Sequence, residues 1–132
     1  MAIDTILLAI GADDDDRAEA LTRAVTEIAV PTEAEVILAH VLGEDDFEEV
    51  QDRLSEGGER LTPDQVADRH RTVRTISEKL RDAGIRPSIR GATGERGETI
   101  VTLAEETGAD RIVIGGRSRS PTGKAVFGST AQ

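Results

Sequence analysis

The chain contains no cysteine, very little lysine and no long apolar segment. Without cysteine, neither a disulfide framework nor a thiolate metal site is available. The longest apolar run, Ile6–Ile10, is far shorter than the roughly 20 residues that a membrane-spanning helix needs. The N-terminus also lacks the basic and long apolar stretches of a secretory signal. We therefore expect a cytoplasmic protein that has no membrane partner.

Acidic residues outnumber basic ones by 26 to 16, which gives a formal net charge of −10. Only Lys79 and Lys124 are lysines, and all other basic residues are arginines. This composition is typical of proteins that work in molar salt, where a Debye length of about 3 Å screens acidic self-repulsion. We interpret the source as halophilic, and specifically haloarchaeal; an ordinary soluble acidic protein is the alternative. The charge also argues against a nucleic-acid partner.

Apolar runs alternate with helical patterns along the 132 residues, which form one domain, 1–132. Buried strands are predicted at residues 5–10, 35–41, 85–92 and 111–114. Each consecutive pair is separated by at least one amphipathic helix. This order predicts an α/β fold with a single-domain open parallel sheet, Rossmann-like, in three α/β/α layers.

Several local signals set the expected boundaries of these elements. Pro31 is expected to end the first helix. Thr62, Pro63 and Gln65 form the signature of a capping box, and the helix that they begin is predicted to run to Gly84. His70 would then lie on the apolar stripe of that helix. Pro87 indicates an edge position or an irregular start for the third strand.

The last 22 residues contain four basic side chains and no acid, although the chain as a whole is strongly acidic. A local cationic, glycine- and serine-rich segment after a buried strand predicts one phosphate-binding place. It is not a Walker A loop, because Ser118 stands where the first glycine is required and Ala125 follows Lys124. Ligands of parallel sheets bind at the carboxyl ends of the strands, here after Ile10, Val41 and Ile114.

The segment Asp110–Gly115 and the residues after it resemble the nucleotide loop of the universal stress protein family, of the UspA-like kind. Gly115 takes the first glycine position, Ser118 falls at the second, and Gly128-Ser129-Thr130 closes the motif. The resemblance covers nearly the whole chain. It implies an adenine-nucleotide alpha-hydrolase-like fold, a homodimer, and ATP with Mg²⁺ as the ligand of the binding members.

Carried over by position, the resemblance implies a set of nucleotide contacts. Ile10 and Val41 would line the adenine, and Ile114 and Gly115 the ribose. Small or hydroxylated residues at a helix start can donate to phosphate, and basic side chains can add charge-assisted contacts. The residues expected in these phosphate roles are Arg117, Ser118, Arg119, Lys124, Gly128, Ser129 and Thr130.

Three departures from the family pattern bear on this site. Gly11 stands where nucleotide-binding relatives carry an aspartate, and Asp13 is the candidate substitute. Ser118 replaces a glycine, so that its Cβ can crowd a phosphate or its hydroxyl can bind one. The sequence stops at Gln132, where the family continues through a helix into a last strand used in dimer pairing. Either the polypeptide is truncated or its true end lies beyond Gln132, and a chain that lacks this strand is not expected to form the usual strand-exchange dimer.

No nucleophile, base and orienting acid can be assembled from these motifs, and no catalytic or metal residue is assigned. His40 is expected to be a satisfied, half-buried histidine, and His70 to be a packing residue. The acidic runs Asp13–Asp16 and Glu44–Glu49 lack the spacing of a calcium loop and are expected to be solvated. The leading hypothesis is a stress-response regulator that binds ATP or a related nucleotide. The alternative is a non-nucleotide-binding interaction or scaffold module with an unknown protein partner; a slow ATPase is third.

Overall fold

The computed structural model describes residues 4–11, 14–54, 60–114 and 117–119, the last three by their backbone alone. The strands are β1 (Thr5–Ala9), β2 (Glu35–Leu42), β3 (Ser88–Thr93), β4 (Arg111–Ile114) and β5 (Arg117–Arg119). They form one sheet in the order β3-β2-β1-β4-β5. The first four strands are parallel, and only β5 runs antiparallel to its neighbour, β4.

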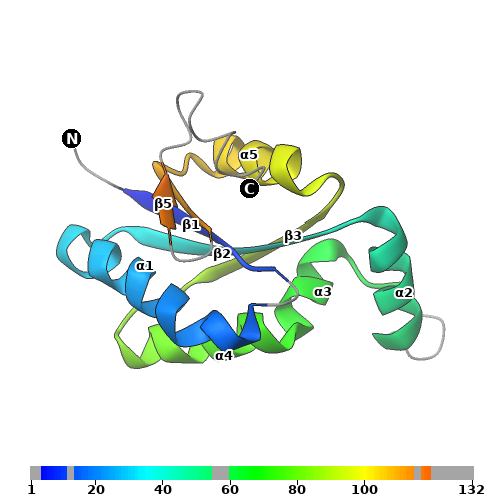
Figure 1. Ribbon diagram of the computed structural model, residues 1–132, viewed down its shortest axis with the longest axis horizontal. Coiled ribbons are helices and arrows are strands. Elements are labelled where there is room, and N and C mark those ends of the chain that lie inside the picture. Colours follow the sequence, from blue (N-terminus) through cyan, green and yellow to red (C-terminus); the bar gives the residue numbers. More distant parts are fainter. Residues whose placement is uncertain (1–3, 12–13, 55–59, 115–116, 120–132) are drawn as a thin grey trace.

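Helices cover both faces of the sheet (Figure 1). The short 3₁₀ helix η1 (Asp15–Arg17) leads into α1 (Ala18–Thr32), which packs beside α4 (Arg71–Asp82) on one face. Helix α5 (Arg96–Thr107) covers the other face. Helices α2 (Glu44–Leu54) and α3 (Pro63–Arg69) lie near the carboxyl end of β2. The expected three-layer α/β/α fold is confirmed.

Two apolar cores hold these layers together. Strand β1 is buried along its whole length because it is central and covered on both faces. Its alternate side chains therefore serve different cores: Ile6 and Leu8 pack toward α1 and α4, whereas Leu7 and Ala9 pack toward α5. A strand buried in this way has no polar face, which explains its continuous apolar sequence.

The expected capping box is present at the start of α3. Gln65 donates its backbone N–H to Thr62 Oγ1 over 3.2 Å, and Thr62 donates its own to Gln65 Oε1 over 2.8 Å. Strand β3 lies at the edge of the sheet, which is one of the two possibilities that Pro87 indicated. None of the helices within the described ranges is long and apolar enough to cross a membrane.

The single helix predicted from Thr62 to Gly84 is wrong, because the chain breaks into α3 and α4 at His70. The backbone of His70 is extended, with φ −69° and ψ 132°. Its ring lies against that of His40, with the centroids 4.1 Å apart. Tertiary packing of this side chain outweighs the continuous helical pattern of its neighbours.

Two other boundaries differ from expectation. Helix α1 continues through Pro31 to Thr32 and ends at Glu33, which has a left-handed φ of 57°. The proline removes one hydrogen bond to Glu27, whose position is exposed to water. Residues Arg117–Arg119, expected in a loop, form the edge strand β5, with Ser118 opposite Val113. Charged residues are common on edge strands because they discourage further pairing.

Candidate functional site

The carboxyl ends of β1, β2 and β4 meet at one edge of the sheet. Ala9 is paired in register with Ala39 on β2 and with Ile114 on β4. The chain continues from β1 to β2 on one side and returns to β4 on the other. The strand order therefore reverses between β1 and β4, which is where parallel α/β sheets place their ligands.

The structure brings four residues of the predicted nucleotide site to this edge, namely Ile10, Gly11, Val41 and Ile114. The three that carry side chains turn them to different faces. Val41 and Ile114 belong to the face covered by α5. Ile10 packs into the opposite core and is 1% exposed. Its backbone N–H donates to the carbonyl oxygen of Ala39 over 2.8 Å. Ile10 therefore shapes this edge through its backbone, whereas Val41 and Ile114 do so through their side chains.

A buried carboxylate, that of Asp14, lies beside Gly11. Asp14 is 8% exposed, and its Oδ2 accepts a hydrogen bond from the Gly11 backbone N–H over 2.7 Å. Its Oδ1 is 3.7 Å from Arg17 Nη1. The sequence pattern pointed to Asp13, which lies outside the described residues, and missed Asp14. The edge of the sheet thus carries a carboxylate even though position 11 has none.

A guanidinium also faces Gly11 across the edge. A Cβ atom built on Gly11 would lie 3.2 Å from Nη2 of Arg96, the first residue of α5, and 3.3 Å from Asp14 Oδ2. Sequence reasoning did not select Arg96. The available signal was its place directly after β3, which also ends at this edge. The site therefore holds one acidic and one basic side chain close to the same glycine.

Two histidines lie behind this edge, at the end of β2. His40 is 2% exposed, and its Nδ1 is 2.8 Å from the carbonyl oxygen of Ile10. A carbonyl oxygen only accepts, so His40 Nδ1 carries the proton. His40 is thus a satisfied histidine as expected, and more buried than predicted. Burial lowers its pKa below the ordinary value of 6.5.

His70 is stacked on His40 with the two ring planes tilted by 38°. Its Nδ1 is buried and has no hydrogen-bond partner among the described residues. Burial, and next to it the neighbouring His40, lower the pKa of His70 from 6.5 to about 4. Both rings are therefore neutral at pH 7. His70 packs as expected, but at a break between helices rather than on a helical stripe.

The remaining predicted contacts fall at the end of the chain. For Arg117, Ser118 and Arg119 the structure gives the backbone of β5 and no side chains. The other predicted contacts, Gly115, Lys124, Gly128, Ser129 and Thr130, lie outside the described residues. Within the described ranges, no group of three or more His, Asp or Glu side chains is arranged to hold a metal ion.

The fold and the reversal of strand order define an α/β protein of the doubly wound class. The model of the universal stress protein family matches residues 2–132. The chain therefore belongs to the universal stress protein family, which confirms the family resemblance found in the sequence.

Solved structures share this fold at low sequence identity. The protein MJ0577, the subject of a structure-based assignment of biochemical function, is 23% identical with a TM-score of 0.63, over 86% of this chain and 74% of its own. A universal stress protein in complex with cAMP is 19% identical with a TM-score of 0.58, over 85% and 71%. A family member from Burkholderia pseudomallei is 18% identical with a TM-score of 0.59, over 98% and 88%. No curated protein sequence matches the chain.

Proposed function

We propose that this universal-stress-type protein is a stress-response regulator that binds ATP or a related adenine nucleotide, with Mg²⁺, where the strand order reverses between β1 and β4. The observation that carries the proposal is the meeting of the β1, β2 and β4 ends at one edge. The segment with the family's nucleotide motif, Gly115–Thr130, follows β4 directly. The neighbour crystallised with cAMP supports an adenine nucleotide as the ligand class.

The proposal gives Asp14 the role that the family pattern gives to an aspartate at position 11. Its buried carboxylate lies beside the Gly11 backbone, at the end of the central strand. A carboxylate there can accept hydrogen bonds from ribose hydroxyls. Arg96, close to the same glycine, can pair with a phosphate. Val41 and Ile114, on the face covered by α5, would contact the adenine and the ribose, respectively.

The first test is a calorimetric titration of Mg²⁺–ATP into the protein in molar KCl, which screens the charge of −10. One-site binding is expected in the wild type, a partial loss in Gly128→Ala and a full loss in Gly128→Val. The two variants place a small and a larger side chain at the same position, so that each is compared with the other. Circular dichroism verifies that both are folded. Equal affinity in all three proteins would overturn the assigned loop.

A second titration tests the carboxylate. Asp14→Asn keeps the shape of the side chain and an oxygen for Gly11 N–H but removes the charge. We expect it to weaken ATP binding about tenfold, as for the loss of a charge-assisted hydrogen bond. Asp16→Asn, on the exposed side of η1, is the matched control. Equal effects of the two variants would contradict a role for Asp14.

The second candidate function is an interaction or scaffold module that binds no nucleotide. It is favoured by Gly11, which provides no carboxylate where nucleotide-binding relatives carry an aspartate. It is also favoured by Ser118, whose backbone lies in the strand β5. A folded wild-type protein with no affinity for ATP, ADP, AMP or cAMP would select this alternative. Sedimentation with and without ATP would test the homodimer, and phosphate release would test a slow ATPase.

A further inference from the structure

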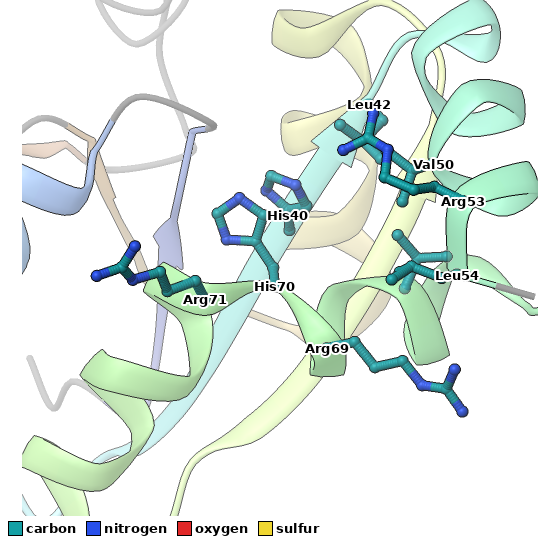
Figure 2. A pocket seen from close by; sticks show the side chains of 9 residues that line it. His40, Leu42, Val50, Arg53, Leu54, Arg69, His70 and Arg71 are labelled. Carbon is teal, nitrogen blue, oxygen red and sulfur yellow. The ribbon is translucent and has the colours of Figure 1, made fainter.

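A cavity of ≈ 320 Å³ lies on the face of β2 that carries α3 and α4 (Figure 2). It lies between the carboxyl end of β2, helix α2 and the break between α3 and α4. One wall is apolar, and the stacked rings of His40 and His70 form the facing wall. The apolar side chains are Leu42, Val50, Leu54 and Val66. Small-molecule pockets in proteins commonly have about this volume.

This cavity is separate from the proposed nucleotide site. Successive side chains of a strand point to opposite faces, and the cavity is lined by His40 and Leu42. Val41, which lies between them, and Ala39, which precedes them, belong to the core beneath α5. The reversal of strand order lies at β1 and β4, one strand further away. A ligand in the cavity would therefore lie across β2 from a nucleotide at Val41.

The histidine wall is polar but uncharged. His40 uses its Nδ1 proton on the Ile10 carbonyl, so its Nε2 carries a lone pair. The pKa of each ring is lowered by burial, that of His70 to about 4. The rings at pH 7 are thus flat, neutral surfaces that face aliphatic side chains. Such a slot favours a flat aromatic group, because ring pairs gain from stacked or edge-to-face contact.

Three arginines line the cavity: Arg53, Arg69 and Arg71. The guanidinium of Arg53 extends from α2 across Leu42, toward the apolar side chains, whereas the side chains of Arg69 and Arg71 extend in other directions (Figure 2). Among the described residues, the ion-pair partner of Arg53 is Glu49, at 3.9 Å, and both side chains are largely exposed, at 68% and 74%. A pair of that length and exposure is weak, so Arg53 is available to a stronger partner. A carboxylate matches the planar fork of a guanidinium.

We propose that this cavity binds a small planar aromatic carboxylate, with its ring between the histidine wall and the Val50–Leu54 face of α2 and its carboxylate at Arg53. The apolar side chains pack against the ring. The neutral histidines contact it without the desolvation of a charge, and Arg53 pairs with the carboxylate. This site does not depend on nucleotide binding at the strand ends.

The test uses 2-naphthoate as the probe and 2-naphthalenemethanol as its neutral counterpart. The chain has no tryptophan and no tyrosine, so naphthalene fluorescence is measured without the emission of those two residue types. We expect saturable binding of 2-naphthoate with a Kd of about 1 mM or tighter, in keeping with the affinity limits of a ligand this small. Absence of saturable binding by the folded wild type at several millimolar would overturn the proposal.

Two variants separate the ring from the charge. Arg53→Gln is expected to weaken 2-naphthoate about tenfold and to leave 2-naphthalenemethanol within about twofold. Val50→Phe fills the cavity and should weaken both probes. Arg23→Gln, an exposed arginine on α1, is the matched control for the change of protein charge. A loss in Arg53→Gln no larger than in Arg23→Gln would overturn the assignment, as would unchanged binding in Val50→Phe.

Discussion

His40 donates a hydrogen bond from Nδ1 to the carbonyl oxygen of Ile10 over 2.8 Å and thereby joins the end of β2 to the end of β1. Both residues are almost fully buried. The bond fixes the tautomer of His40 and the position of its ring, against which His70 packs. One hydrogen bond therefore connects the edge proposed for the nucleotide with the histidine wall of the cavity.

Removal of this bond should destabilise the fold. His40→Leu keeps much of the side-chain volume but leaves the Ile10 carbonyl without its partner, which costs about 1–3 kcal/mol. His40→Asn places an amide nitrogen near the position of Nδ1, and we expect it to lose less. Urea denaturation of the three proteins measures the difference. Equal losses in both variants would show that the hydrogen bond does not contribute.

The two histidines should make stability depend on pH. Burial is the largest cause of both lowered pKa values. Arg96 further lowers the pKa of His40, and His40 further lowers the pKa of His70. The carboxylates act in the opposite direction: Asp14 raises the pKa of both histidines, and Asp15 raises that of His70. The unfolded chain binds protons near pH 6.5, whereas the folded chain binds that of His70 only near pH 4. The contribution of the neutral histidine to the free energy of unfolding is therefore fully present above about pH 6.5 and is lost as the pH drops toward 4.

The variant His70→Phe tests this dependence, because it keeps a ring against His40 but cannot titrate. Between pH 6.5 and 5, where most carboxylates stay ionised, the free energy of unfolding should fall less steeply than in the wild type. The change in slope cannot exceed the value for the uptake of one proton by His70. The partial exposure of His70 makes the expected change smaller than this limit. Denaturant titrations at several pH values provide the measurement, and parallel slopes would contradict the shifted pKa.

Gly91 should tolerate no side chain, in contrast to Gly11. A Cβ on Gly91 would lie 2.0 Å from the backbone oxygen of Pro63, because the start of α3 packs directly on β3. The three atoms nearest to a Cβ on Gly11 belong to the side chains of Arg96 and Asp14, at 3.2 Å or more. We expect Gly91→Ala to cost at least about 2 kcal/mol and Gly11→Ala less than about 1 kcal/mol. Thermal unfolding of the pair measures both, and similar losses would be inconsistent with this packing.

The sequence predicts the sheet and its helices because their signals are local. Buried strands are continuously apolar, and the capping box at Thr62 depends on residues three positions apart. The break at His70 was missed because it depends on His40, 30 residues earlier in the chain. A glycine within a strand signals the close approach of another backbone, but the pattern around Gly91 does not say which one.

The candidate site was predictable in place but not in detail. The ends of β1, β2 and β4 were expected at one edge because parallel strands share their direction. The choice of Asp14 over Asp13 could not be made, since four successive aspartates give no pattern that would single out the one bonded to the Gly11 N–H. Arg96 approaches Gly11 from another element, so its role required the three-dimensional packing of α5.

Gln51 should hold the wall of the proposed aromatic-carboxylate cavity in place. It is 3% exposed; its Nε2 donates to the carbonyl oxygen of Leu61 over 3.2 Å, and its Oε1 accepts from the Leu61 backbone N–H over 2.9 Å. These two bonds anchor α2, which carries Val50, Arg53 and Leu54, to the segment before α3.

Replacement of Gln51 by Leu leaves two buried backbone groups of Leu61 unpaired, and we expect a loss of about 2–4 kcal/mol in the stability of α2. Hydrogen exchange of the α2 amides should quicken much more than that of the β1 amides, because the change is local. Binding of 2-naphthoate should weaken in parallel, whereas ATP affinity should stay within about twofold, since α2 lies away from the β1–β4 edge. Asp52→Asn, the adjacent exposed position, serves as the control. Equal protection of α2 in Gln51→Leu and Asp52→Asn would show that the helix is held by its apolar contacts alone.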